Sequence, residues 1–433
     1  QAAFKQAGVI EVPDLAALFD VAWALSCQPL PEGNRVSIFT NAGGPAALAS
    51  DSLAVNGFSL ANIGEQKQKL LAEKLNPSAQ VSNPVDMLGG AEPEEFSHCI
   101  STLLDDPGVD AFLPILVPQA LVDPGDVARA IVENANKTEK TVLACMVGEK
   151  SLDEARKVLH KNNVPMTIFP EVLGQVLGAM AKYKSWKDKV ISEAFSFSDI
   201  NRSDVAIALS RINKAVFGES DTRPILDAYG MALVPGGFAE DFAQAAAIAA
   251  DIGYPVALKV VSEQILHKSD MGGIKLNIIS DSALKNAIEA MKEKIAAAAK
   301  DAAIDGYLVE KMAPEGLEVI VGMRRDPTFG PLMMFGLGGV YVELFKDVGF
   351  GVAPFSPDQA KEMIFSTKAG RLLQGFRGGP VYDLDAVVEV IGRLSQLSMD
   401  FPQVSEIEIN PLLVLSEGQG AIVLDARMIL TEN

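Results

Sequence analysis

The sequence predicts an α/β protein in which a doubly wound parallel sheet is followed by a second domain of α+β type. In the first half, short apolar strands alternate with amphipathic helices, a pattern typical of parallel sheets. In the second half, strands follow one another through short loops, which favours antiparallel pairing. The polar stretch 196–203 separates the two patterns and is interpreted as the linker.

Composition narrows the range of partners. The 433 residues are enough for about two to three domains, and the formal net charge of −19 argues against nucleic acid as a partner. No apolar run reaches the length of a membrane span, so we expect no membrane partner. The three cysteines (Cys27, Cys99 and Cys145) follow no metal-binding or disulfide spacing, which predicts a reducing, cytoplasmic environment.

The first half is expected to alternate between strands and helices. Strands are predicted at 35–40, 58–60, 109–117, 141–147 and 164–169. Helices are predicted from about 45 to 56 and at 65–75, 94–104, 124–134, 152–161 and 171–186. Ligands of such sheets bind at the carboxyl ends of the strands. The segments 41–45, 83–86 and 114–118 lie at or near such ends.

One of these segments, Asn41-Ala-Gly-Gly-Pro45, joins the first strand to a helix. Proline just inside a helix start is favoured. Gly43 and Gly44 leave amide groups at the positive end of the helix, which is a ready anion site. An ordinary strand-to-helix turn needs the same small residues, and both interpretations stay open at this point.

The second half is expected to be a sheet with helices packed on it. Helices are predicted at 204–217, 221–229, 242–252 and 282–300, and strands at 256–261, from 274, and at 306–312, 316–324, 405–410 and 420–427. The stretch 368–379 is basic and rich in glycine. It is interpreted either as a loop that closes over phosphates or as a surface segment.

The strand 256–261 is apolar except for Lys259, which must have a partner because an unpaired buried ammonium group is costly. The loop after it contains His267, Lys268, Ser269, Gly272 and Gly273. Ammonium groups and exposed backbone amides are what polyphosphate recognition requires. An ordinary hairpin with an exposed loop is the alternative.

Two further strands carry groups suited to a nucleoside. The strand 306–312 ends in Glu310, Lys311 and Met312, where free backbone groups would be able to hydrogen-bond an adenine. Glu318 alternates with the apolar residues of the next strand, and its carboxylate is suited to ribose hydroxyls or to a lysine. A structural salt bridge is the alternative for Glu318.

The last hairpin points to a metal. If its loop is 416–419, Leu415 pairs with Gly420, and Asn410 then lies opposite Asp425. Residues directly opposite each other have their Cβ atoms about 5 Å apart on one face. An amide oxygen and a carboxylate are suitable ligands for Mg²⁺ that shares its shell with phosphates. A cross-strand hydrogen bond is the alternative.

Several of these stretches together resemble a known family. Leu258-Lys259, Leu266-His-Lys-Ser-Asp270, Gly272-Gly273 and Glu408-Ile-Asn-Pro-Leu412 resemble the ADP-forming acyl-CoA synthetases, which are relatives of succinyl-CoA synthetase. The second half is thus similar to an ATP-grasp domain. The first half is similar to the flavodoxin-like domain of the same family, through 41–45 and 83–86. The resemblance covers nearly the whole chain.

The resemblance implies a role for each site residue. His267 would carry a phosphoryl group, and the nucleotide would be bound by Lys259, Lys268, Ser269, Gly272, Gly273, Glu310, Lys311, Met312 and Glu318. Asn410 and Asp425 would bind Mg²⁺. Asn41, Gly43 and Gly44 would stabilise the phosphohistidine.

The resemblance also implies an organisation and an activity. Residues 1–32 would be the tail of a preceding domain and a connecting helix, 33–195 the flavodoxin-like domain and 196–433 the ATP-grasp domain. The CoA-binding domain and the first phosphohistidine domain would be missing. The expected activity joins a small carboxylic acid to CoA with ATP, giving ADP and phosphate, in a homo-oligomer. Two alternatives stay open: an ATP-grasp ligase with an amine acceptor, and a regulatory module of a protein acetyltransferase.

Overall fold

The computed structural model describes residues 1–148, 150–190, 192–211, 215–262, 264, 271–298, 303–339 and 347–431. The chain divides into two compact units. The N-terminal unit is Ala7–Val190, and the C-terminal unit is Ile191–Asn433 together with Gln1–Gln6. The first helix, α1 (Ala2–Gln6), belongs to the C-terminal unit because the Gln6 side chain exchanges two hydrogen bonds with the backbone of Val352, at 2.8 and 2.9 Å.

The N-terminal unit is built on a parallel sheet, as the sequence predicts. The main path of the sheet has the strand order β2-β1-β4-β6-β7, with β3 beside β1 and β5 beside β4. All pairs are parallel. The strands are β1 (Arg35–Thr40), β2 (Ser59–Leu60), β3 (Val85–Asp86), β4 (Ala111–Leu116), β5 (Thr141–Val142), β6 (Ala144–Met146) and β7 (Met166–Thr167).

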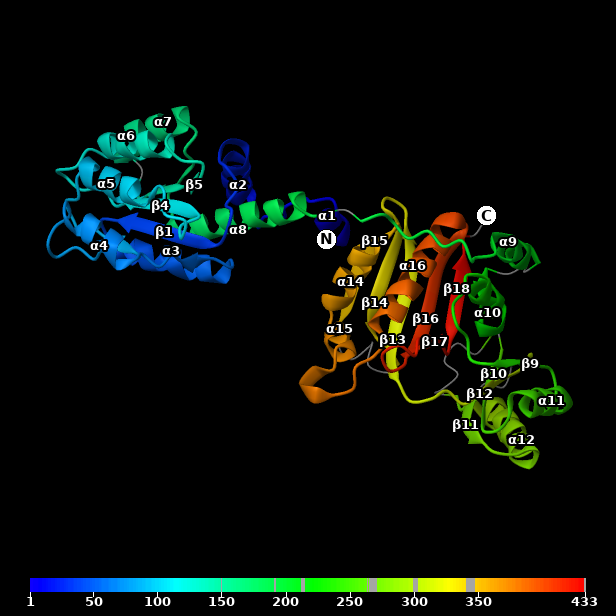
Figure 1. Cartoon of the computed structure of the whole chain (residues 1–433). Helices are drawn as coiled ribbons and strands as arrows, with labels where there is room; N and C mark the ends of the chain where they lie inside the picture. Colours follow the sequence, from blue (N-terminus) through cyan, green and yellow to red (C-terminus); the bar gives the residue numbers. More distant parts are fainter. Residues whose placement is uncertain are drawn as a thin grey trace. The chain divides into compact units, whose positions relative to one another are not determined.

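Helices cover both faces of this sheet, which confirms the doubly wound arrangement (Figure 1). One core lies beneath α2 (Leu15–Cys27), α3 (Gly43–Val55) and α8 (Pro170–Lys187). The other lies beneath α4 (Glu65–Ala72), α5 (Pro93–Leu103), α6 (Pro124–Ala135) and α7 (Asp153–Lys161). Neighbouring residues of one strand enter opposite cores, as Ile38 and Phe39 do, because side chains alternate along a strand.

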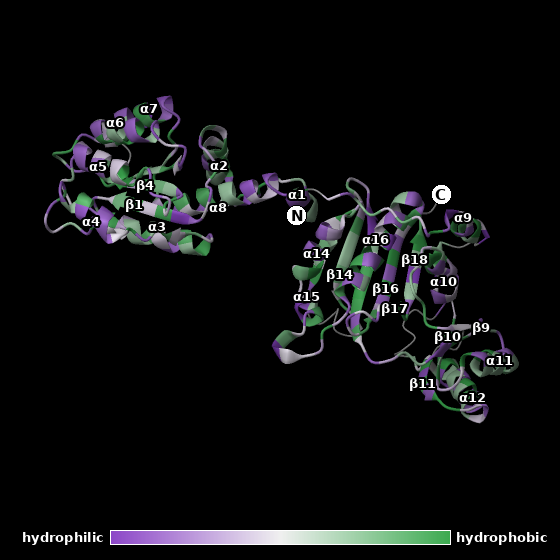
Figure 2. Cartoon of the chain, in the orientation of Figure 1, coloured by the Kyte–Doolittle hydropathy of each residue, from purple (hydrophilic) through white to green (hydrophobic). Residues whose placement is uncertain are grey.

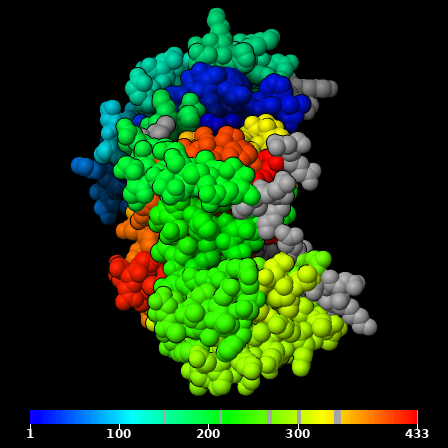
Figure 3. All heavy atoms as spheres, turned by 90° about the vertical axis from the view of Figure 1, so that its right-hand side faces the viewer, coloured from blue at the N-terminus to red at the C-terminus, as the bar shows by residue number. Residues whose placement is uncertain are grey.

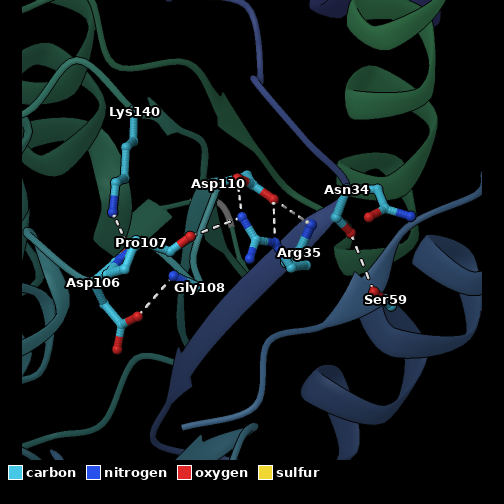
Figure 4. Close-up of polar contacts among 8 residues, drawn as sticks. All are labelled: Asn34, Arg35, Ser59, Asp106, Pro107, Gly108, Asp110 and Lys140. Atoms are coloured by element: carbon cyan, nitrogen blue, oxygen red, sulfur yellow. Dashed lines mark hydrogen bonds and ion pairs between the residues drawn. The ribbon is translucent and has the colours of Figure 1, made fainter.

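An ion pair fixes the amino ends of β1 and β4 (Figure 4). The Arg35 guanidinium donates to both carboxylate oxygens of Asp110, each at 2.9 Å, and the Arg35 amide donates to the same carboxylate. Arg35 also donates to the Pro107 carbonyl at 2.8 Å. Burial alone would raise the pKa of Asp110, but the hydrogen bonds and charge of Arg35 lower it below its ordinary value. The ion pair therefore lies at the amino edge of the sheet, at the end of β1 and β4 opposite to their carboxyl ends.

We expect Asp110→Asn to destabilise the protein in a pH-dependent way. Because the folded-state pKa of Asp110 is lowered, its contribution is present above the unfolded-state pKa and is lost as the pH falls through the folded-state value. The variant should melt about 3 °C below the wild type at pH 7, and the gap should narrow in acid. Thermal unfolding at several pH values measures this, with Asp51→Asn on the exposed side of α3 as control. A gap that does not change with pH would contradict the assignment.

The C-terminal unit contains two antiparallel sheets, in agreement with the sequence. The larger has the order β15-β14-β13-β16-β18-β8 with β17 beside β16, and the smaller has the order β11-β10-β12-β9. The larger sheet consists of β8 (Val216–Phe217), β13 (Leu317–Asp326), β14 (Gly330–Leu337), β15 (Val348–Val352), β16 (Val404–Val414), β17 (Ala421–Val423) and β18 (Ala426–Leu430). The smaller consists of β9 (Gly236–Ala239), β10 (Val256–Val261), β11 (Ile274–Ile278) and β12 (Gly306–Lys311).

Each sheet has its own helices and its own core. The helices of the unit are α9 (Arg202–Arg211), α10 (Glu219–Ala228), α11 (Phe242–Ile252), α12 (Asp281–Ala298), α14 (Pro357–Phe365), α15 (Lys368–Leu373) and α16 (Leu384–Asp400). The smaller sheet packs with α11 and α12, and α14 to α16 pack with the larger one. Figure 2 shows that the strands of the larger sheet are mainly hydrophobic.

Two predicted segments differ from the structure. The helix expected over 204–217 ends at Arg211, and Val216–Phe217 forms the edge strand β8 instead. The stretch 368–379 is not simply a loop, because it begins with helix α15. The Thr367 hydroxyl caps that helix by accepting from the Gly370 amide at 3.1 Å.

All three cysteines are free. Within the described part of the chain, none of the helices combines the length and the apolar character that crossing a bilayer needs.

Candidate nucleotide site

Lys259 lies on β10, the strand of the smaller sheet that pairs with β11 on one side and β12 on the other. Its side chain is buried, with 8% of the residue exposed. The ammonium group donates to Glu219 Oε1 at 2.8 Å and to the Leu424 carbonyl at 2.5 Å, and it lies 2.6 Å from Glu310 Oε2. The prediction that Lys259 must have a partner is confirmed.

Arg223 completes this group of charges, which we call the Lys259 cluster: Lys259, Glu310, Glu219 and Arg223. Glu310 lies on β12, diagonally across from Lys259, and only 2% of it is exposed. Its other carboxylate oxygen accepts from Arg223 Nη1, and Arg223 Nη2 donates to the Val234 carbonyl at 2.5 Å. Glu219 and Arg223 both come from the first half of α10.

The cluster keeps its lysine charged. Burial alone would lower the pKa of Lys259, but the carboxylates of Glu219, Glu310 and Asp425 together raise it above its ordinary value. Burial raises the pKa of Glu310, and the charges of Lys259 and Arg223 oppose this in part. The cluster therefore presents a permanent cation surrounded by acidic groups. The hydrogen bond from Lys259 to the Leu424 carbonyl places the last hairpin beside this ammonium group.

The register of that hairpin is the predicted one. The Leu415 amide donates to the Gly420 carbonyl at 3.0 Å, and the Asn410 amide donates to the Asp425 carbonyl at 3.0 Å. The ladder continues without a shift from Leu412 opposite Val423 to Ile409 opposite Ala426. Asn410 and Asp425 are therefore direct neighbours on one face of the sheet.

Asn410 and Glu318 meet at Gly339. The Gly339 amide donates to Asn410 Oδ1 at 3.1 Å. A Cβ atom at Gly339 would lie 2.6 Å from Glu318 Oε2, and the backbone there has a φ of +60°. A side chain at position 339 would therefore displace the end of the Glu318 side chain, in a backbone conformation that favours glycine. Glu318 is exposed on β13, next to an irregularity in its pairing with β16.

The backbone amides at the end of β12 make hydrogen bonds that the sequence did not predict. The amides of Lys311 and Met312 donate to the carbonyls of Pro235 and Pro255, at 2.9 and 3.2 Å. The Lys311 ammonium donates to the Ile252 carbonyl at 3.0 Å. The predicted free backbone edge thus has no unbonded amide at these two residues. Glu310 also points into the Lys259 cluster, away from this strand end.

The glycine loop is described only in part. Gly272 has a φ of +69°, and the Gly273 carbonyl accepts from the Val260 amide at 2.8 Å, so both residues return the chain to β11 beside Lys259. His267, Lys268 and Ser269 lie outside the described residues.

The second predicted group lies at the carboxyl edge of the N-terminal sheet. Asn41 is 2% exposed and joins the ends of β1 and β4, because its side chain both donates to and accepts from the Val117 backbone at 2.9 Å. Gly43 and Gly44 open α3, as predicted. A Cβ at Gly44 would meet no atom within 4 Å, whereas one at Gly43 would lie 3.1 Å from Asp86 Oδ2.

Sequence reasoning missed Glu219 and Arg223. The need for a partner of Lys259 indicated an acidic residue but not its position, because α10 is far from β10 in the chain. Among the described residues, no three His, Cys, Asp or Glu side chains are arranged to hold a metal. The predicted metal pair is of another kind, because it consists of an asparagine and an aspartate.

Comparison with known proteins identifies the domains of the chain. A family model described as an ATP-grasp domain matches residues 208–430, and one described as a ligase-CoA domain matches residues 36–190. The chain is 38% identical over 435 residues to acetate–CoA ligase [ADP-forming] I of Archaeoglobus fulgidus. The match covers 100% of this chain and 62% of that protein. The chain thus spans about three fifths of the length of such curated relatives.

Two further proteins match about half of the chain each. The beta subunit of acetate–CoA ligase [ADP-forming] I from Pyrococcus furiosus is 42% identical over 212 residues, 49% of this chain and 90% of that subunit. A solved structure of acetyl-coenzyme A synthetase 1 from Candidatus Korarchaeum cryptofilum, in complex with coenzyme A, Ca-AMPCP and HgCl⁺, is 37% identical. It matches 53% of this chain and 100% of that chain, with a TM-score of 0.50. The chain therefore belongs to the family of ADP-forming acyl-CoA ligases that carry an ATP-grasp domain and a ligase-CoA domain.

Proposed function

We propose that this chain supplies the nucleotide-binding and phosphoryl-transfer part of a ligase that joins a carboxylic acid and CoA, with ATP converted to ADP and phosphate. The observation that carries the proposal is the buried Lys259 ammonium beside the hairpin of Asn410 and Asp425. A fixed cation next to two hard oxygen ligands suits a nucleotide triphosphate bound with a divalent metal.

Each residue has a physical part in this proposal. Lys259 offsets the charge of the phosphates. The amides of Gly272 and Gly273 are close enough in sequence to the strand to line the same site. Glu318 is suited to accept hydrogen bonds from ribose, because it is an exposed carboxylate at the strand start. Bound Mg²⁺, held by Asn410 and Asp425, would neutralise charge on the phosphate oxygens.

The chemical step assigned to His267 is a phosphoryl transfer. A ring nitrogen of the neutral imidazole attacks the γ-phosphorus of ATP, the bond from that phosphorus to the β–γ bridging oxygen breaks, and ADP leaves. The resulting phosphohistidine carries negative charge. The open amino end of α3 at Gly43 and Gly44 is suited to such an anion. The phosphoryl group would then pass to the carboxylic acid, and CoA would displace phosphate from the acyl phosphate.

Incubation of the protein with γ-labelled ATP and Mg²⁺ tests this function. We expect base-stable, acid-labile label on the protein, as a phosphohistidine gives, and no label with EDTA. A protein that binds ATP but takes up no label would favour the nucleotide-sensing alternative. Label on a released acyl phosphate without any label on histidine would favour the ligase that uses an amine acceptor.

Asp425→Asn should raise the Mg²⁺ concentration that gives half-maximal labelling by at least about tenfold. The amide that replaces the carboxylate keeps an oxygen ligand but removes the negative charge that attracts the metal. A Mg²⁺ titration of the labelling rate measures the shift. Asp227→Asn, the same charge change at an exposed position of α10, is the matched control. Equal titration curves for Asp425→Asn and the wild type would place the metal elsewhere.

A further inference from the structure

The two sheets of the C-terminal unit have separate cores. The larger sheet packs with one set of buried side chains and the smaller sheet with another. The proposed nucleotide contacts are divided between them. Lys259 belongs to the smaller sheet, whereas Asn410 and Asp425 belong to the hairpin of the larger one. A ligand that contacts both groups therefore depends on how the two sheets are held together.

Helix α10 belongs to the core of the larger sheet, where its residues Ile225 and Leu226 are fully buried. Figure 3 looks onto the side of the unit that carries α9 to α12, which are helices of both cores. Arg223 lies two residues before Ile225, and its Nη1 donates to Glu310 Oε1 on β12 of the smaller sheet. Arg223 therefore links a helix of one core to a strand of the other sheet.

Arg223 also holds the chain where it passes from one sheet to the other. Its Nη2 donates to the Val234 carbonyl at 2.5 Å. Two residues before Val234, the Ala232 carbonyl accepts from the Val423 amide of β17 at 2.9 Å. The carbonyl of the residue after Val234 accepts from the Lys311 amide of β12, also at 2.9 Å. Val234 thus lies between a contact with the larger sheet and a contact with the smaller one.

Glu310 connects Arg223 to Lys259. One of its carboxylate oxygens accepts from Arg223, and the other lies 2.6 Å from the Lys259 ammonium. Only 2% of Glu310 is exposed, so water does not readily replace either partner. Burial raises the pKa of Glu310, and the charges of Lys259 and Arg223 oppose the rise. Arg223 thus favours the ionised form of Glu310 and fixes its orientation beside Lys259.

We propose that Arg223 is a positioning residue for the nucleotide: through Glu310 it holds Lys259 at a fixed place relative to the hairpin of Asn410 and Asp425. The inference rests on the proposed function, because it needs a nucleotide phosphate and its metal to lie between these groups. Arg223 acts without touching the ligand, since its guanidinium is bonded to a carboxylate of the smaller sheet and to a backbone carbonyl.

Arg223→Met tests the proposal, with ADP as the probe and calorimetry as the measurement. The dissociation constant for MgADP, which contacts both sheets, should rise about tenfold, and that for ADP in EDTA by no more than about twofold. Arg211→Met removes the same charge from the exposed end of α9 and should leave both constants unchanged. Equal weakening of both ligands in Arg223→Met would indicate a merely structural role and overturn the proposal.

A double-mutant cycle with Glu310→Gln distinguishes positioning from direct contact with the ligand. The amide has one acceptor oxygen in place of two, so it no longer gives each cation an oxygen of its own. If Arg223 acts through Glu310, Arg223→Met/Glu310→Gln should bind MgADP within about twofold of the weaker single variant. Losses that simply multiply would show that Arg223 acts on the ligand without Glu310, and the proposal would be wrong.

If Arg223→Met does not fold, Arg223→Lys serves instead. It keeps the charge but lacks the planar group that bonds Glu310 and the Val234 carbonyl together, so the dissociation constant for MgADP should rise about threefold. An unchanged constant in either variant overturns the proposal. Lys259→Met separates this inference from the proposed function. Normal MgADP binding by Lys259→Met contradicts both, whereas lost binding, together with an unchanged constant in the Arg223 variant, contradicts only the role of Arg223.

Discussion

Replacement of Lys259 by methionine is expected to reduce nucleotide affinity at least about a hundredfold and to lower the free energy of unfolding by about 3 kcal/mol. Both effects have one cause. Lys259 is the cation that offsets buried carboxylates in the empty site, and we propose that it offsets phosphates in the filled one. Without it, Glu219 remains as a buried charge with its salt bridge broken. Calorimetric binding of MgADP and denaturant unfolding measure the two effects separately.

A double variant distinguishes lost binding from lost stability. In Lys259→Met/Glu219→Leu both partners of one ion pair are replaced by apolar groups, while Glu310 keeps Arg223. Such replacement of a buried pair is often neutral for stability. We therefore expect the double variant to unfold nearer the wild-type midpoint than Lys259→Met does, and still not to bind MgADP. Normal binding by this stable variant would show that Lys259 is not needed for the nucleotide.

Replacement of His267 by asparagine should reduce labelling from γ-labelled ATP at least about a thousandfold. An imidazole nitrogen is a nucleophile near neutral pH, and an amide nitrogen is not. MgADP affinity should change little, because the proposed nucleotide contacts are made by other residues. The initial rate of label incorporation is the measurement. Labelling at the wild-type rate would show that His267 does not carry the phosphoryl group.

The other two histidines of the chain are matched controls. A ring nitrogen of His98 lies 2.8 Å from the Leu70 carbonyl on the surface of the N-terminal unit. The ring of His160 lies 5.1 Å from that of Trp23. Both residues lie on helices, and neither has a part in the proposed site. His98→Asn and His160→Asn should therefore take up label as the wild type does.

Local patterns in the sequence predicted most of the architecture. The alternation of apolar strands and amphipathic helices predicted the parallel sheet with helices on both faces, because burial of a sheet on two sides requires that order. The last hairpin is the clearest case. Counting from a four-residue loop placed Asn410 opposite Asp425, since antiparallel pairing leaves no freedom once the turn is set.

Predictions from composition were weaker than those from periodicity. Four glycines and three basic residues suggested that 368–379 is a loop, but the Thr367 cap and the apolar face of the next residues make a helix of 368–373. The predicted end of the helix over 204–217 is wrong for a related reason. Val216 and Phe217 fit a strand or a helix equally well by pattern, and pairing with Ile429 and Met428 of β18 decides for the strand.

The partners of Lys259 are contacts that the sequence alone does not identify. A lysine within an apolar strand requires a counter-ion, and that much follows from the cost of burying a charge. Which carboxylate meets it depends on the packing of α10 against the sheets, and no spacing in the chain reports that contact. Glu310 was predicted as a nucleoside contact at a strand end, yet diagonal pairing of β10 and β12 brings it to Lys259.

The order of residues by itself determined the elements, the direction of most pairings, the hairpin register and the need for a charge partner at Lys259. These follow from forces between near neighbours: backbone hydrogen bonds, alternation of side chains and the burial of apolar faces. Only the tertiary structure decided that Glu219 and Arg223 join Lys259 and Glu310, and that Glu318 and Asn410 meet at Gly339. Such contacts bring together segments that are distant in the chain, and the packing of whole helices and sheets sets them.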